Sequence, residues 1–156
     1  MPDIDTLLCT LSEKADPAKG WGRADESWSF MAAARSLGME QWFQLGDGDL
    51  ALHVDRTARL AAGESLSAIT RRHAAAWGVE VEMLPMSDDA VATHVSTSDG
   101  ELGFQDYFVR QQCRPPVRSI RFEGAASARP GPSVLKRILD PGLRAILIAP
   151  SNPYLS

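Results

Sequence analysis

The sequence is poor in the residues that usually bind metals or form disulfides. Its 156 residues include only two cysteines, Cys9 and Cys113, and three histidines. The cysteines lie far apart, neither belongs to a CxxC pair, and no histidine stands near them at zinc-ligand spacing. We therefore expect no structural zinc and predict that both thiols are reduced.

Long hydrophobic runs and blocks of one charge are also lacking. The most hydrophobic run, Ala145 to Ala149, is far shorter than the roughly 20 residues that cross a membrane, and no cleavable signal precedes the first polar residues. Twenty acidic and sixteen basic residues give a net charge of −4, with the two signs interleaved. We therefore expect neither nucleic acid nor a membrane as a partner. We expect a cytoplasmic location. Arg71-Arg72 is an alternative anion site, although a solvated helix face explains it better.

Helical periodicity is the clearest positive pattern in the sequence. One amphipathic helix is predicted to open at Ser65 and to stop at Gly78. Weaker signals of the same kind predict helices near Thr6–Leu11, Glu26–Leu37, Leu50–Leu60, Gln105–Gln112 and Ser133–Leu139. A chain of this length with 44% hydrophobic residues can bury one core, so residues 1–156 are expected to form a single partial domain.

Strand-like runs lie between the predicted helices. Val79–Met83 and Val117–Phe122 alternate polar with apolar residues, and Ala145–Ile148 is typical of a fully buried parallel strand. Val91–Thr97 and Glu101–Phe104 are predicted to form a hairpin, because Asp-Gly is a favoured tight-turn pair. The pattern predicts an α/β layered fold with a largely parallel sheet and a small β-hairpin addition.

Both ends of the chain are unusual for such a fold. It begins with Pro-Asp-Ile-Asp-Thr and stops at Ser-Asn-Pro-Tyr-Leu-Ser, just past its most hydrophobic segment. A nucleotide-using α/β domain usually begins with a strand and a Gly-rich phosphate turn, and no such turn occurs here. We therefore expect a fold that is incomplete at both ends.

Two carboxylates precede the first predicted helix. Asp3 or Asp5 can cap that helix through its first amides, which requires no ligand. The alternative is that one of them faces a ligand hydroxyl or a hydrated magnesium ion, which prefers carboxylate oxygen. Their spacing does not decide between these hypotheses.

The segment from Gly20 to Trp28 gathers candidate ligand contacts around one helix start. Trp21 and Trp28 offer flat faces for stacking, although both also suit buried aromatic anchors. Arg23 is a loop arginine, and such forks often bind phosphate or carboxylate groups. Asp25 is predicted to cap the helix that starts there.

Two further loops carry polar candidates. The run Gln44–Leu50 has alternating acids and glycines before a helix, but it lacks the acidic ladder and the closing Glu of an EF-hand. Ser151 and Asn152 follow the last hydrophobic run, where α/β folds bind ligands, and they suit phosphate oxygens as well as a simple Asn-Pro turn. We interpret the three histidines, His53, His73 and His94, as structural or surface residues. The two acids after Ser87 are interpreted as part of a turn.

Seven motifs in order resemble the 2-phospho-L-lactate transferase family along essentially the whole chain. They are PDIDT at Pro2, GWGRADESW at Gly20, WFQLGDGDLA at Trp42, LPMSDD at Leu84, FQDYFVRQQC at Phe104, VRSIRFEGA at Val117 and APSNPYLS at Ala149. The resemblance implies a Rossmann-like phosphotransferase that takes a guanosine-diphosphate-activated phospholactate, or its enolpyruvyl counterpart. The phosphorylated group passes to the hydroxyl of the deazaflavin Fo, a precursor of coenzyme F-420, and guanosine monophosphate leaves.

The resemblance also assigns roles to residues. It implies that Asp5 contacts the deazaflavin and is the catalytic candidate. Gln44 occupies a second contact position, where the family can carry Lys. The Gln44 amide donates and accepts hydrogen bonds but cannot supply a cation there. Trp21 and Arg23 are the further deazaflavin candidates, and Ser151 and Asn152 are the donor-phosphate candidates. Magnesium is the expected cofactor, because a diphosphate donor concentrates negative charge, with Asp3 and Asp5 as its nearest acidic candidates.

Departures from the family pattern leave other hypotheses open. Gly48 and Gly103 stand where relatives often show a charged or imidazole side chain, and the Gly-rich nucleotide turn is absent. The alternatives are a nucleotide-binding regulatory protein of the same fold and an inactive remnant. The chain by itself is expected not to catalyse the transfer, and its exposed sheet edges favour association, with a homodimer as one form.

Overall fold

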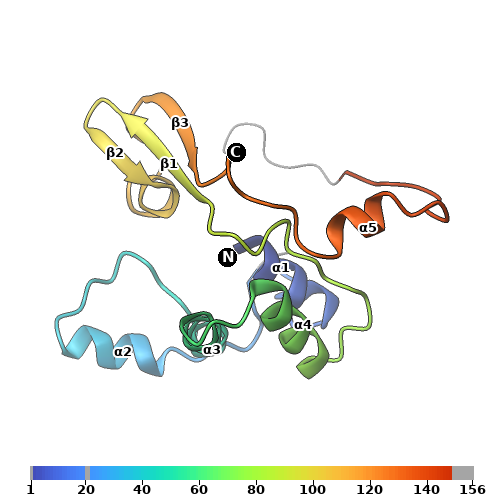
Figure 1. The fold of residues 1–156 in the computed structure, drawn as a ribbon. Helices are drawn as coiled ribbons and strands as arrows, with labels where there is room; N and C mark the ends of the chain where they lie inside the picture. The colour runs from blue at the N-terminus through green and yellow to red at the C-terminus, as the bar shows by residue number, and fades with distance from the viewer. Residues whose placement is uncertain (1, 20–21, 149–156) are drawn as a thin grey trace. The chain divides into compact units, whose positions relative to one another are not determined.

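The computed structural model describes residues 2–19 and 22–148, and the chain divides into two compact units, Met1–Asp88 and Asp89–Ser156 (Figure 1). The first unit is helical and the second holds the sheet. The mixture of helices and strands confirms the α/β class. The single partial domain over residues 1–156 stays a prediction.

Four helices build the part of the first unit that the structure describes, and each lies where periodicity predicts one. They are α1 (Pro2–Leu11), α2 (Ser29–Ser36), α3 (Asp47–Ala61) and α4 (Leu66–Ala76). α1 begins earlier than expected, at Pro2, a residue that the first turn of a helix tolerates because the amide there has no partner. α4 is capped by Ser65, whose Oγ accepts a hydrogen bond from the Ala68 amide at 3.3 Å.

The core of this unit lies among α1, α3 and α4. Leu8, Leu52 and Ala74 come one from each helix and pack together, and the partly buried Trp77, Val79 and Met83 lie against them. Leu8 is 1% exposed. Apolar burial at this junction therefore holds three helices together with few residues.

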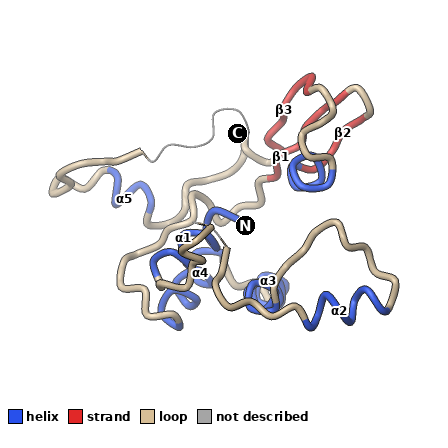
Figure 2. The backbone as a smooth tube through the Cα atoms, turned by 180° about the vertical axis from the view of Figure 1, so that it is seen from behind, coloured by secondary structure: helices blue, strands red, loops and turns tan. Residues whose placement is uncertain are grey.

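The second unit contains a three-stranded antiparallel sheet, coloured red in Figure 2. Its strands are β1 (Ala92–Thr97), β2 (Gly100–Gly103) and β3 (Val117–Glu123), in the order β2-β1-β3. The predicted Asp-Gly hairpin is confirmed, since Thr97 pairs with Gly100 across the turn. A π-helix, η1 (Asp106–Arg110), follows β2, and a short helix, α5 (Val134–Ile138), lies further along.

Gly124 ends β3 at a position that only glycine fits. Its φ is +81°, and a Cβ atom there would overlap the carbonyl oxygen of Ala90. The chain leaving β3 thus passes directly against the segment that enters β1.

The expected parallel sheet is wrong for the residues that the structure describes. Both pairings of β1 are antiparallel, as hairpin-linked strands must be. Val79–Met83 does not join a sheet, and Ala145–Ile148, which we predicted as a buried parallel strand, is exposed, with Leu147 at 93%. An apolar run becomes a strand only when a neighbouring strand pairs with it, and among residues 2–19 and 22–148 neither run has that neighbour. The Rossmann-like layering stays a prediction.

Helices of the described ranges are short or polar. None of them is both long enough and apolar enough to span a bilayer.

Replacing Leu8 by alanine should destabilise the first unit far more than the same change at its neighbour Leu7. Leu8 is in the core and Leu7 is 54% exposed. We expect Leu8→Ala to lower the free energy of unfolding by about 2–5 kcal/mol and Leu7→Ala to change it by less than about 0.5 kcal/mol. Urea denaturation followed by circular dichroism at the helical band measures both values. Equal losses in the two variants would contradict the placement of this core.

Candidate functional site

Asp5 is bound by a buried arginine of α3. Nη1 of Arg56 donates to Oδ2 of Asp5 at 3.1 Å, and Nη2 donates to Oδ1. Arg56 is only 5% exposed although it carries a charge. The two parallel hydrogen bonds form a bidentate pair, which is the arrangement that a guanidinium and a carboxylate favour. Asp5 therefore joins α1 to α3 and is not simply a helix cap.

His53 lies one turn before Arg56 on the same helix. Its Nε2 is 3.7 Å from Oδ2 of Asp5. Burial lowers the pKa of His53 below its ordinary value, and the nearby Asp5 charge opposes that effect without reversing it. The imidazole is therefore expected to be neutral at neutral pH, and its contact with Asp5 lacks the strength of a full ion pair.

The loop before α2 reaches the first turn of α3. The Glu26 carboxylate accepts hydrogen bonds from the amides of Gly48, at 2.8 Å, and Asp49, at 3.0 Å. A Cβ atom on Gly48 would overlap Glu26 and the Arg23 guanidinium, so the glycine lets this carboxylate approach the helix end. The absence of a side chain at Gly48 thus leaves room for the Glu26 carboxylate and the Arg23 guanidinium.

A reciprocal cap runs from α3 back to α2. The Asp47 carboxylate accepts hydrogen bonds from the Ser27 hydroxyl at 2.6 Å and from the Ser29 and Phe30 amides at 3.0 Å. Together with Glu26, it ties the starts of the two helices to each other. These bonds also explain why α2 begins at Ser29, since the residues before it serve the caps.

Negative charge gathers where α1 meets the start of α3. Burial raises the pKa of Asp49, and the charges of Glu26 and Asp5 raise it further. Burial is also the largest cause of the raised pKa of Cys9, followed by the charge of Asp49. The Cys9 thiol is consequently protonated and unsuited to act as a nucleophile.

Arg23, a predicted ligand contact, packs within the unit. Its guanidinium lies 5.4 Å from the centre of the Trp77 ring, which Lys14 also approaches at 5.6 Å. Its Nε is 3.9 Å from Oε1 of Glu26. The loop that carries Arg23 is thus fixed to the end of α4 by cation–π contacts and faces the first turn of α3.

Of the remaining predicted ligand contacts, the structure describes Gln44 and leaves three others outside its described residues. Gln44 is exposed in the loop before α3, with its Nε2 3.3 Å from the carbonyl oxygen of Gln41. Trp21, Ser151 and Asn152 lie outside the described residues. Their proposed roles stay predictions.

Asp3 and Asp5 do not fit one magnesium ion as joint ligands. Both lie within α1, and residues two positions apart on a helix do not face each other. Both oxygens of Asp5 are also engaged by a guanidinium, which would place its positive charge beside the ion. Among the described residues no group of three His, Cys, Asp or Glu side chains could hold a metal. Magnesium itself stays a prediction.

Sequence reasoning missed Arg56 and Glu26, whereas Asp49 was among the alternating acids that it noted before a helix. The signal for Arg56 was present, because Asp49, Leu52 and Arg56 recur at the spacing of one helix face and Leu52 is in the core. For His73 and His94, the structure gives carboxylate neighbours, Asp55 at 2.8 Å and Glu123 at 2.9 Å. These contacts agree with the structural roles that the sequence suggested.

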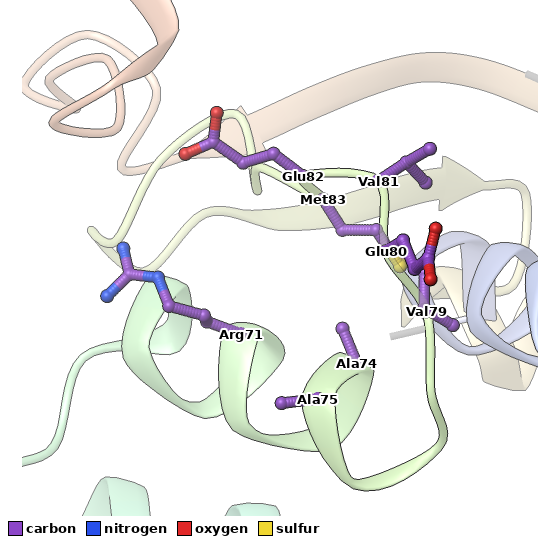
Figure 3. A pocket seen from close by; sticks show the side chains of 8 residues that line it. All are labelled: Arg71, Ala74, Ala75, Val79, Glu80, Val81, Glu82 and Met83. Atoms are coloured by element: carbon purple, nitrogen blue, oxygen red, sulfur yellow. The ribbon is translucent and has the colours of Figure 1, made fainter.

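A depression of about 290 Å³ lies elsewhere in the first unit, between α4 and the segment that follows it (Figure 3). Ala74 points from the helix toward that segment, and Arg71 lies at one end, on the same side as Glu82. Of the candidate ligand contacts that the sequence singled out, it contains Arg71, the alternative anion site, and none of the predicted deazaflavin or donor contacts.

Comparison with known proteins identifies the family. A sequence profile described as "2-phospho-L-lactate transferase CofD" matches residues 1–156. The chain belongs to this family. Relatives called phosphoenolpyruvate transferase are similar to it along 99% of its length, at 42% identity in Kitasatospora aureofaciens and in Thermobifida fusca and 38% in Mycolicibacterium smegmatis. The chain spans 49% of the length of each of these three.

The cap that Asp47 provides to α2 should be lost in acid. Its hydrogen bonds to Ser27, Phe30 and Ser29 lower the pKa of Asp47 below the ordinary value of 3.8. A carboxyl group with a lowered pKa in the folded state stabilises that state above its unfolded pKa, and the contribution disappears as pH falls through the folded value.

We therefore expect the Ser29 and Phe30 amide NMR signals to be constant near neutral pH and to shift in acid with a midpoint below pH 3.8. In Asp47→Ala, which lacks the carboxylate, this transition should be absent. A midpoint above 3.8 in the unsubstituted protein would show that the cap does not favour the ionised form.

Proposed function

We propose that this chain is part of a transferase of coenzyme F-420 biosynthesis. The enzyme moves a phosphoenolpyruvyl or 2-phospholactyl group from a guanosine-diphosphate-activated donor to the deazaflavin Fo, with release of guanosine monophosphate. The family match over residues 1–156 is the observation that carries this proposal. The names of the relatives favour the enolpyruvyl donor.

The reaction needs a hydroxyl acceptor placed in line with a phosphorus atom. The hydroxyl oxygen of Fo forms a new bond to the phosphorus that carries the enolpyruvyl group, and the bond from that phosphorus to the guanosine monophosphate oxygen breaks. The hydroxyl proton passes to solvent water, and the leaving phosphate takes the electron pair. Positioning and charge compensation supply most of the catalysis in such transfers.

Asp5 is the proposed contact for the deazaflavin. Both oxygens of its carboxylate accept hydrogen bonds from Arg56, and His53 lies beside it. The Asp5 side chain is 15% exposed. A carboxylate in this state accepts hydrogen bonds from hydroxyl or N–H groups of a ligand. Gln44 is proposed as the second contact, as an amide that both donates and accepts.

The remaining predicted contacts complete the proposal. Trp21 and Arg23 are proposed for the deazaflavin, and Ser151 and Asn152 for the donor phosphate. Magnesium supplies positive charge against the donor diphosphate when it is bound, and we expect it there with ligands other than the Asp3–Asp5 pair. The cytoplasmic location and the homodimer are further proposals.

Asp5→Asn should weaken binding of Fo by about tenfold, equivalent to about 1.4 kcal/mol. The substitution preserves size but removes the charge of the acceptor and one acceptor oxygen. Titration of the 156-residue protein with Fo, followed by the fluorescence of the deazaflavin, measures the dissociation constant.

Asp3→Asn is the matched control, because Asp3 lies exposed on the same helix. It should bind Fo like the unsubstituted protein. If Asp5→Asn also bound Fo normally, Asp5 would have no ligand role. Transfer itself is followed as release of guanosine monophosphate by a polypeptide of the relatives' length that carries this chain.

A further inference from the structure

Arg56 differs from the other arginines whose ion pairs hold the first unit together. Its side chain is 6% exposed, whereas that of Arg59, one turn further along α3, is 32% exposed. Arg59 divides its hydrogen bonds between Asp55 and Glu64, while both terminal nitrogens of Arg56 donate to Asp5. A buried charge is tolerated only when it is fully paired, so Arg56 commits its charge to this one carboxylate.

The Arg56 guanidinium fixes the plane of the Asp5 carboxylate and also compensates its charge. Two parallel N–H···O bonds determine the rotation of the Asp5 carboxylate about its last bond, because turning the group would break both of them. Lysine at the same position would supply a point charge without this directional control. The direction in which Asp5 can accept a further hydrogen bond is therefore set by Arg56.

The charges around Asp5 select the kind of group that can approach it. The charges of Glu26 and Asp5 both act on the Asp49 carboxyl group, and Arg23 is engaged with Glu26 and Trp77. A diphosphate would meet this negative charge, and a cation would meet the guanidinium on Asp5. An uncharged hydroxyl or N–H group meets neither obstacle.

We propose that Arg56 is the positioning residue of the deazaflavin site, holding Asp5 as an oriented hydrogen-bond acceptor for an uncharged hydroxyl or N–H group of the acceptor substrate. Asp5 thereby serves neither the anionic donor nor a magnesium ion. This inference rests on the proposed function, in which Asp5 contacts the deazaflavin.

Titration with Fo of the 156-residue protein and its Arg56→Lys variant tests this role. Lysine keeps the charge and loses the fork, so Arg56→Lys should weaken Fo binding by about tenfold. Arg59→Lys is the matched control, because it makes the same change on the same helix at an arginine that does not bind Asp5. It should bind Fo within about twofold of the unsubstituted protein.

A double-mutant cycle separates positioning from a general effect on stability. If Arg56 acts through Asp5, Asp5→Asn combined with Arg56→Lys should bind Fo no more weakly than Asp5→Asn alone. Independent losses that multiply in the double variant would overturn the positioning role. Thermal unfolding of each variant identifies the fraction folded at the titration temperature, and dissociation constants refer to that fraction.

Magnesium alone gives a test that requires no change at Arg56. Calorimetric titration with magnesium chloride should give the same isotherm for the unsubstituted protein and for Asp5→Asn. Magnesium binding that Asp5→Asn abolishes would make Asp5 a metal ligand and overturn the inference.

The outcomes distinguish this inference from the proposed function. Absence of Fo binding to the unsubstituted protein would overturn both. Fo binding that Asp5→Asn weakens and Arg56→Lys leaves unchanged would overturn the positioning role alone and leave the proposed function standing.

Discussion

The ion pair between Arg56 and Asp5 fixes where α1 lies on α3. A buried guanidinium is strongly unfavourable without a carboxylate, so the two helices can pack only in the register that brings these side chains together. Leu8 lies three residues after Asp5, and Leu52 lies four before Arg56, so the same two helix faces also supply the apolar core. The charge pair therefore selects one arrangement from the many that apolar contacts alone would allow.

One face of α3 then connects the core to the polar groups of the site. Asp49, His53 and Arg56 recur along it at helical spacing, beginning at the end that Glu26 caps. The loop that carries Glu26 is in turn fixed against Trp77 through Arg23. Because each of these groups is held by another part of the unit, the surroundings of Asp5 are preorganised before any ligand arrives.

The sequence predicted the elements whose signals are local. Periodicity located the helices, and the turn chemistry of Asp99-Gly100 located the hairpin. The buried parallel strand at Ala145–Ile148 was wrong, because pairing depends on a neighbour that an apolar pattern does not reveal. Glu26 was placed inside a helix, yet it lies before α2 because its carboxylate serves α3. Arg56 shares a helix face with Leu52, but the sequence does not reveal that Asp5 of α1 is its partner.

The reciprocal caps join the start of α2 to the start of α3. Residues 31–46 thus form an excursion of the chain whose two ends are held together. With both ends of this excursion held, its length has little influence on the rest of the unit, since doubling a flexible loop costs only about 0.6 kcal/mol in closure entropy. We therefore expect insertions and deletions to be tolerated between the end of α2 at Ser36 and the proposed contact Gln44, while the positions that close the excursion are constrained. This connecting stretch can diverge between homologues while α3 keeps its place.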